Sequence, residues 1–182
     1  MVSSEEERIV REAIAGNQAA FTVLYNEHFD KVYRYVYFRI SVRSEAEDIT
    51  QEVFLKALQA IGSFKWREVP FAAWLFRIAH NLVIDHMRKK SKHKTAPLEE
   101  AWAVSVEDPV AMTEQRFEMA DLAAALKRLP PAQQEVISLR FIAGMPIAEV
   151  ARTLKKSEGT VKALQFNGTA SLRKVFSEGR NG

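Results

Sequence analysis

Four carboxylates and one amide stand close together in the first third of the chain, where they could serve metal or acid–base chemistry. Asp48 and Glu52 are four positions apart, so a helix would place both on one face. Glu45, Glu47 and Gln51 stand beside them. A metal-dependent hydrolase could use such a face, but no histidine is near it, and acids are favoured at a helix start without any chemical role. We interpret this face as solvated or protein-binding, and we expect no metal.

The other reactive side chains show no catalytic or cofactor pattern. The four histidines lack the spacing of a zinc motif, no serine lies in a nucleophile elbow, and no glycine-rich phosphate loop occurs. The absence of cysteine excludes disulfides and thiolate metal sites. These side chains therefore indicate no enzyme class, and we expect no cofactor or small-molecule substrate.

A second group of residues suits nucleic-acid binding. The stretch 70–94 carries apolar residues at spacings of three and four, which predicts a long helix with one packed face, and it ends in a run of cations. The loop before it, residues 63–69, holds two aromatic and two basic residues. Capture of a single strand requires stacking surfaces together with cations. The alternative is a core helix with a solvated basic end, since runs of like charge are often only tails.

A third pattern, near the C-terminus, is two helices joined by a tight turn. Ala151 is small enough to lie where two helices cross, and Val161, ten positions later, can lock the second helix. Ser157 is a suitable N-cap for that helix. The spacing is typical of a helix-turn-helix, with an ordinary helical hairpin as the alternative. The outward positions would be Glu158, Thr160, Lys162, Ala163, Phe166 and Asn167, with Arg173 and Lys174 further on as phosphate contacts.

Helices must position all these groups, because apolar residues recur at helical spacing and no strand pattern or repeat appears. We predict an all-α fold of two helical domains, residues 1–94 and 116–182, joined by a linker at 95–115 where the periodicity is lost. In the helix that carries the acidic face, Ser44 and Glu47 form a capping-box pattern, and Phe54 and Leu58 are expected to face inward.

Composition agrees with a cytoplasmic protein. The chain has 182 residues, of which 47% are hydrophobic and 27% charged, so it can bury cores and stay in solution. No apolar run reaches the length of a membrane span, and the N-terminus lacks the apolar segment of a signal peptide, so we expect no membrane insertion. The net charge of +3 favours a nucleic-acid partner only weakly.

Together these motifs resemble sigma factors of the sigma-70 family, in particular the compact extracytoplasmic-function (ECF) group. The resemblance covers nearly everything from Asn17 to Val175. FTVLYNEHFDKVYRYVYFRI resembles the first conserved helix of the family's domain two, and AEDITQEVFLKAL is close to the stretch that docks on RNA polymerase. FAAWLFRIAHNLVIDHMRKKSK is similar to the part that melts and reads the promoter −10 element. LPPAQQEVISLRF, IAEVARTLKKSEGTVKALQ and SLRK resemble domain four, which reads the −35 element.

The resemblance implies an initiation factor that binds core RNA polymerase and promoter DNA. Its polymerase contacts would be the β′ clamp helices and the β flap, and an anti-sigma factor would be a further partner. The residues implied for polymerase docking are Asp48, Gln51, Glu52 and Phe54. Those implied for the −10 element are Phe64, Lys65 and Trp66 around an unstacked base, with Trp74, Arg77, Asn81, Arg88 and Lys89 along the adjacent DNA path. The outward residues of the second helix of the helix-turn-helix would read the −35 element.

Two departures from the family pattern bear on domain four. Lys155 stands in the turn where relatives often have Gly, so it either strains the turn or changes its shape. Asn167 replaces a cation, and Gly168 lowers helix stability by up to about 1 kcal/mol relative to Ala. A helix-turn-helix regulator that acts without polymerase is the main alternative, although such a duplex binder needs neither AEDITQEVF nor the aromatic FKW loop.

Overall fold

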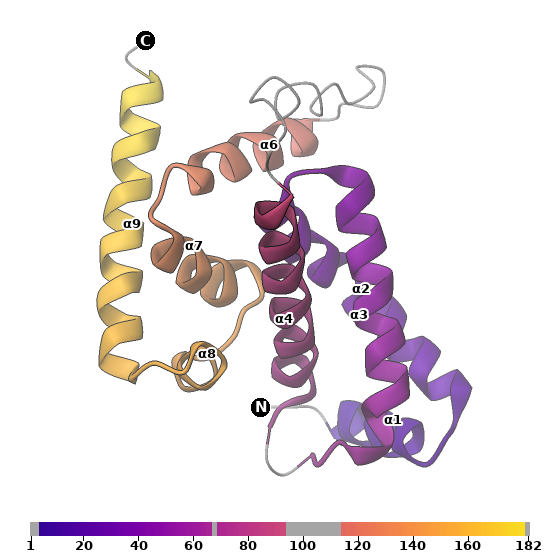
Figure 1. The fold of residues 1–182 in the computed structure, drawn as a ribbon. Helices are drawn as coiled ribbons and strands as arrows, with labels where there is room; N and C mark the ends of the chain where they lie inside the picture. Colours follow the sequence, from indigo (N-terminus) through magenta and orange to yellow (C-terminus); the bar gives the residue numbers. More distant parts are fainter. Residues whose placement is uncertain (1–3, 67–68, 94–113, 181–182) are drawn as a thin grey trace.

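The computed structural model describes residues 4–66, 69–93 and 114–180, and every regular element in this part of the chain is a helix (Figure 1). The all-α prediction is therefore confirmed. The N-terminal elements are α1 (Ser4–Ile14), α2 (Gln18–Ile40), α3 (Arg43–Ala60), the 3-10 turn η1 (Ile61–Ser63) and α4 (Phe71–Lys92). The C-terminal elements are α6 (Glu114–Lys127), α7 (Pro131–Ile137), the π-helical turn η4 (Ser138–Ile142), α8 (Ile147–Leu154) and α9 (Glu158–Arg180).

The start of α3 differs from the predicted capping box. The helix begins at Arg43, after Val42 in extended conformation, and no side chain caps it. Glu47 instead accepts a hydrogen bond from Arg43 Nε at 3.1 Å. The predicted N-cap, Ser44, was wrong by two residues because a favourable ion pair one turn apart competes with the capping geometry of Ser44 and Glu47.

The core of the N-terminal domain lies between α2, α3 and α4. Tyr35, Val53, Leu75 and Phe76 are inaccessible to solvent, and the Tyr35 and Phe76 rings meet edge to face at 5.7 Å. The Tyr35 hydroxyl is satisfied in this core by His80 Nδ1, at 3.3 Å. These contacts fix α4 against α2 and α3, so the opposite face of α4 also has a defined position in the domain.

The two domains pack against each other. Leu139 of η4 and Val150 of α8 belong to the same apolar cluster as the N-terminal core, and Phe38 of α2 packs with Leu126 and Ile137. Figure 1 shows α7 and α8 lying between α4 and the long α9. We refer to this packing of α6–α9 on α2 and α4 as the closed arrangement.

Candidate functional site

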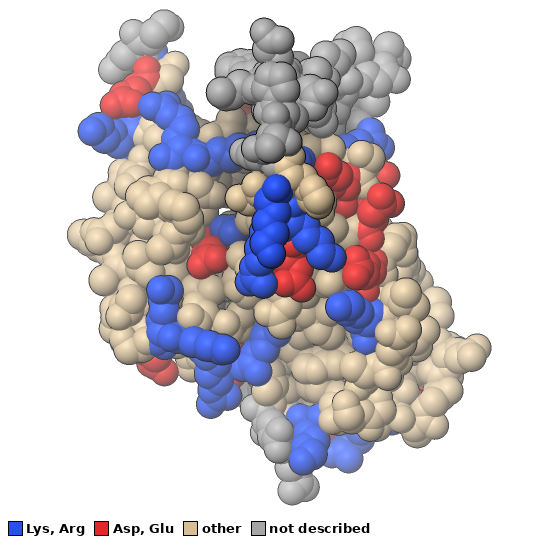
Figure 2. All heavy atoms as spheres, viewed as in Figure 1, with Lys and Arg blue, Asp and Glu red and all other residues tan. Residues whose placement is uncertain are grey.

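The acidic face predicted to bind another protein lies on α3 and is largely open to solvent. Asp48, Gln51 and Glu52 are exposed, and Figure 2 shows acidic side chains gathered on the side of the molecule along which α3 runs. We call these three residues the docking face. Phe54 lies beneath it, 4% exposed, and packs edge to face against Tyr25 at 4.7 Å. Its predicted direct contact with polymerase does not fit this burial.

Two leucines that the sequence reasoning missed extend the docking face. Leu55 and Leu58 are 54% and 48% exposed, so the prediction that Leu58 faces inward was wrong. Leu55 follows Gln51 by four positions and Glu52 by three, which places it on their side of α3. That spacing was the available signal. An acidic face continued by exposed leucines is better suited to a protein partner than to solvent.

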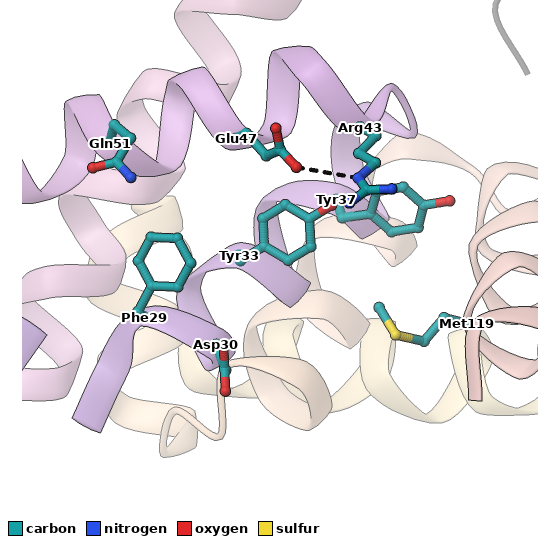
Figure 3. Close-up of a pocket in the computed structure, with 8 residues that line it drawn as sticks. All are labelled: Phe29, Asp30, Tyr33, Tyr37, Arg43, Glu47, Gln51 and Met119. Atoms are coloured by element: carbon teal, nitrogen blue, oxygen red, sulfur yellow. Dashed lines mark hydrogen bonds and ion pairs between the residues drawn. The ribbon is translucent and has the colours of Figure 1, made fainter. Parts of the chain in front are cut away.

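A hollow of about 420 Å³ opens beside the docking face, between α2, α3 and α6 (Figure 3). The rings of Phe29, Tyr33 and Tyr37 stack along α2 with centroids 6.5 and 6.1 Å apart and form one wall. The lining is completed by Asp30 of α2, by Arg43, Glu47 and Gln51 of α3, and by Met119 of α6. An aromatic wall with a charged margin can accept an apolar side chain from a partner.

The aromatic loop before α4 has an inner and an outer part. Phe64 is only 7% exposed, and its ring packs against Trp66 at 6.4 Å and Trp74 at 5.0 Å. Trp66 and Trp74 are half-buried and Lys65 is exposed, while residues 67 and 68 lie outside the described residues. Stacking on a base requires a free ring face, so Phe64 supports the two tryptophans in this conformation and does not itself offer a surface.

The predicted DNA path along α4 is only partly free. Asn81, Arg88 and Lys89 are exposed, and basic side chains gather over the C-terminal part of α4 (Figure 2). Arg77, however, donates to Glu149 Oε2 of α8 at 2.9 Å. The Glu149 side chain is only 9% exposed, so this ion pair is shielded and ties the predicted −10 surface to the helix-turn-helix.

Helices α8 and α9 form the predicted helix-turn-helix. Ala151 and Val161 are buried, at 6% and 0% exposure, where the two helices meet. Ser157 caps α9 by accepting from the Thr160 N–H at 3.1 Å. The six residues predicted to point outward and the two predicted phosphate contacts are all exposed: Glu158, Thr160, Lys162, Ala163, Phe166, Asn167, Arg173 and Lys174.

The structure accounts for both departures in this domain. Lys155 adopts the left-handed conformation that glycine favours, with φ 55° and ψ 45°, which costs about 1–2 kcal/mol in a residue that has a Cβ. Gly168 is buried where α9 crosses α7, and a Cβ there would lie 2.8 Å from Ile137 Cγ1. The glycine is therefore a packing requirement, and its helix-propensity cost is only part of its effect.

The pKa of the buried His80 is strongly shifted by its surroundings. Burial lowers the pKa of His80 to about 4, and the positive charge of Arg39 acts in the same direction. His80 is therefore neutral at neutral pH, as its hydrogen bond with the buried Tyr35 allows.

Other functional classes gain no support from the described part of the chain. Its residues contain no group of three or more histidines, aspartates and glutamates arranged to hold a metal ion. Among its helices, none combines the length and apolar character that a membrane span requires.

Comparisons with known proteins agree with this geometry. The Sigma-70 region 2 family model matches residues 24–93, and the Sigma-70 region 4 model matches residues 125–174. The ECF RNA polymerase sigma factor SigM of Mycobacterium tuberculosis is 32% identical over 163 residues, covering 90% of this chain and 80% of SigM. The chain belongs to the ECF sigma factors.

Two further proteins place this sigma factor among its relatives. The ECF sigma factor BldN of Streptomyces coelicolor is 40% identical over 176 residues, and the match covers 93% of this chain but 65% of BldN. The sigma factor RpoE, solved in complex with the anti-sigma factor NepR from Bartonella quintana, is 23% identical and has a TM-score of 0.70. That alignment covers 86% of this sigma factor and 96% of RpoE, so the two share a fold.

Proposed function

We propose that this sigma factor docks on core RNA polymerase through the docking face of α3 and directs it to promoters. The observation that carries the proposal is the exposure of Asp48, Gln51 and Glu52 together with Leu55 and Leu58 on one helix face. The acidic groups would meet a basic surface on the β′ clamp helices and steer the encounter, while the leucines and the adjacent hollow would supply apolar contact.

The −10 element would be melted and read by the surface formed by the loop and α4. Trp66 and Trp74, half-buried over Phe64, would stack on an unpaired base, with Lys65 close by in the chain. Asn81, Arg88 and Lys89 would then follow the displaced strand, together with Arg77 once it is released from Glu149. Because the polymerase carries out the chemistry, the sigma factor needs no catalytic group of its own.

The −35 element would be read by α9. Lys162 and Phe166 are exposed four positions apart, at 76% exposure for Phe166, so both can enter one major groove. Arg173 and Lys174 would contact phosphates. The apolar Phe166 can recognise a thymine methyl group but gives no salt-dependent contact.

The closed arrangement would have to open before both elements are read. Their names put the elements about 25 base pairs apart, which is about 85 Å of B-form DNA. A compact chain of 182 residues has a radius of gyration of about 16 Å, and therefore a diameter of about 40 Å. Opening would separate Arg77 from Glu149 and free the −10 surface.

An anti-sigma factor would inhibit by covering the docking face or by favouring the closed arrangement. The β flap of polymerase would hold domain four in the open arrangement. We place this activity in the cytoplasm, where polymerase and promoter DNA meet.

Replacing Asp48 and Glu52 with arginine tests docking. We expect the double variant to lose binding to purified core polymerase in a pull-down while its circular dichroism stays unchanged, because both residues are exposed. The matched control replaces Glu5 and Asp121, which are exposed and lie on α1 and α6, and which change the net charge by the same amount. Undiminished polymerase binding by the Asp48 and Glu52 variant would refute the docking assignment. It would favour a helix-turn-helix regulator that acts alone.

A further inference from the structure

A cavity of about 330 Å³ lies where the ends of α2 and α4 meet α6, and its lining includes no residue of the docking face or of α9. Its polar lining comes from five residues: Arg39 of α2, His86, Lys90 and Ser91 of α4, and Lys127 of α6. Four of these carry or can carry a positive charge. The cavity is therefore basic, and it is shared by the two domains.

Arg39 is the least satisfied group in the cavity wall. Its side chain is only 4% exposed, and its Nε and Nη1 are buried without any hydrogen-bond acceptor. Its third nitrogen, Nη2, lies 3.7 Å from Met87 Sδ and 3.9 Å from a carboxylate oxygen of Glu135, both weak contacts. A buried guanidinium normally has acceptors for its donors, but this one has only the distant Glu135 carboxylate as an anionic partner. Because Nε and Nη1 are closed to solvent, a ligand in the cavity would reach them only after the Arg39 side chain shifts.

The other cations are unevenly neutralised. Glu45 accepts from both His86, at 3.0 Å, and Lys90, at 3.1 Å. For Lys127 we find no ion pair or side-chain hydrogen bond within the described ranges. Partial burial and the neighbouring Lys90 lower the pKa of Lys127. Counting Glu45 and Glu135 against Arg39, Lys90 and Lys127 leaves an excess of positive charge.

We propose that this cavity binds a small phosphate-bearing anion, such as the diphosphate part of a nucleotide. A phosphate offers several oxygens at once, which suits a guanidinium, two ammonium groups and the Ser91 hydroxyl that approach from three helices. The volume lies at the low end for ligand sites, and it has room for about ten water-sized groups.

Such a ligand would join α2 and α4 of one domain to α6 of the other. It would bind the closed arrangement more tightly than the open one, and so would shift the population toward the closed form. Binding of the anion can be tested apart from the proposed docking and promoter reading, because none of the cavity residues belongs to the surfaces assigned to them.

The test is isothermal titration of the full chain with inorganic pyrophosphate at about 150 mM salt. Lys127→Gln should weaken pyrophosphate binding at least about tenfold, as expected for loss of a charge-assisted hydrogen bond. Lys127 is exposed, so this change should leave the fold intact. The matched control is Lys56→Gln, which removes an equal charge from the exposed surface of α3 outside the cavity and should leave the affinity within about twofold.

A parallel titration with short duplex DNA distinguishes free phosphate compounds from the DNA backbone as the source of phosphate. We expect DNA binding to be insensitive to Lys127→Gln. The proposal is overturned if pyrophosphate shows no saturable binding, if both variants lose affinity equally, or if only DNA binding depends on Lys127. Equimolar pyrophosphate binding that depends on Lys127 but not on Lys56 supports it, whatever the result of the polymerase pull-down.

Discussion

Gly168→Ala sets two physical effects against each other within α9. Helix propensity alone predicts stabilisation by up to about 1 kcal/mol, because Ala is the better helix former. The new methyl group, however, would lie 2.8 Å from Ile137 Cγ1 and 3.1 Å from its Cδ1. Overpacking of this kind costs about 1–3 kcal/mol. We therefore expect net destabilisation of up to about 2 kcal/mol, which for a chain of this length lowers Tm by up to about 4–8 °C.

Thermal unfolding followed by circular dichroism measures this effect, with Gly179→Ala as the matched control. Gly179 lies on the same helix, and a Cβ there would meet nothing within 4 Å, so Tm should stay the same or rise slightly. Adding Ile137→Val to Gly168→Ala removes one of the two contacted atoms, and it should recover part of the loss that Gly168→Ala causes. Our account of the α7–α9 crossing would be refuted if Gly168→Ala raised Tm as much as Gly179→Ala does.

Four further predictions rest on individual residues. Lys155→Gly should raise the free energy of unfolding, measured in urea, by up to about 1 kcal/mol. The change removes left-handed strain of about 1–2 kcal/mol but gives the unfolded chain more conformational freedom. A lower free energy of unfolding would show that Lys155 is not strained. His80 has a folded pKa of about 4, below its unfolded value of about 6.5, so its contribution is complete above pH 6.5 and is lost as the pH falls toward 4. The free energy of unfolding should fall by on the order of 2 kcal/mol between neutral pH and pH 5, and by much less in His80→Asn. Equal dependence of the unfolding free energy on pH in the two proteins would refute the role of His80. Trp66→Ala should impair promoter opening in permanganate footprinting by about 1–3 kcal/mol and leave closed-complex binding unchanged. Phe64→Ala should instead lower Tm, because it leaves a cavity in the core. A normal Tm together with defective promoter opening would indicate that Phe64 itself stacks on a base.

The helical fold and most exposed site residues could be predicted because they depend on local spacing. A helix period fixes which residues share a face, so Asp48, Gln51 and Glu52 were grouped correctly, and all the outward positions of α9 proved exposed. The helix-turn-helix was equally accessible, since Ala151 and Val161 meet through a contact of short sequence separation. The family resemblance then indicated which partners to expect, namely polymerase for the docking face and promoter DNA for α9.

Local spacing fails where a residue lies at the edge between two faces of a helix. Leu58 was expected inside and is 48% exposed, while Phe54, expected to contact polymerase, is 4% exposed. Neighbouring positions on a helix differ by about 100° in direction, so the packing partner decides which of two marginal positions is covered. The burial of Phe64, at 7% exposure, was not foreseen for a related reason, because the path of an irregular loop has no period from which burial can be read.

The sequence by itself determined the helices, their apolar faces and the motifs of the two domains. Only the tertiary structure showed that Arg77 pairs with Glu149, that Gly168 is required by Ile137, and that Arg39 lines a basic cavity with Lys127. Arg77 and Glu149 are 72 positions apart, and Arg39 and Lys127 are even further apart. No periodic pattern connects residues at such separations, because their meeting depends on how whole helices pack, and that packing is decided by the summed burial of many side chains.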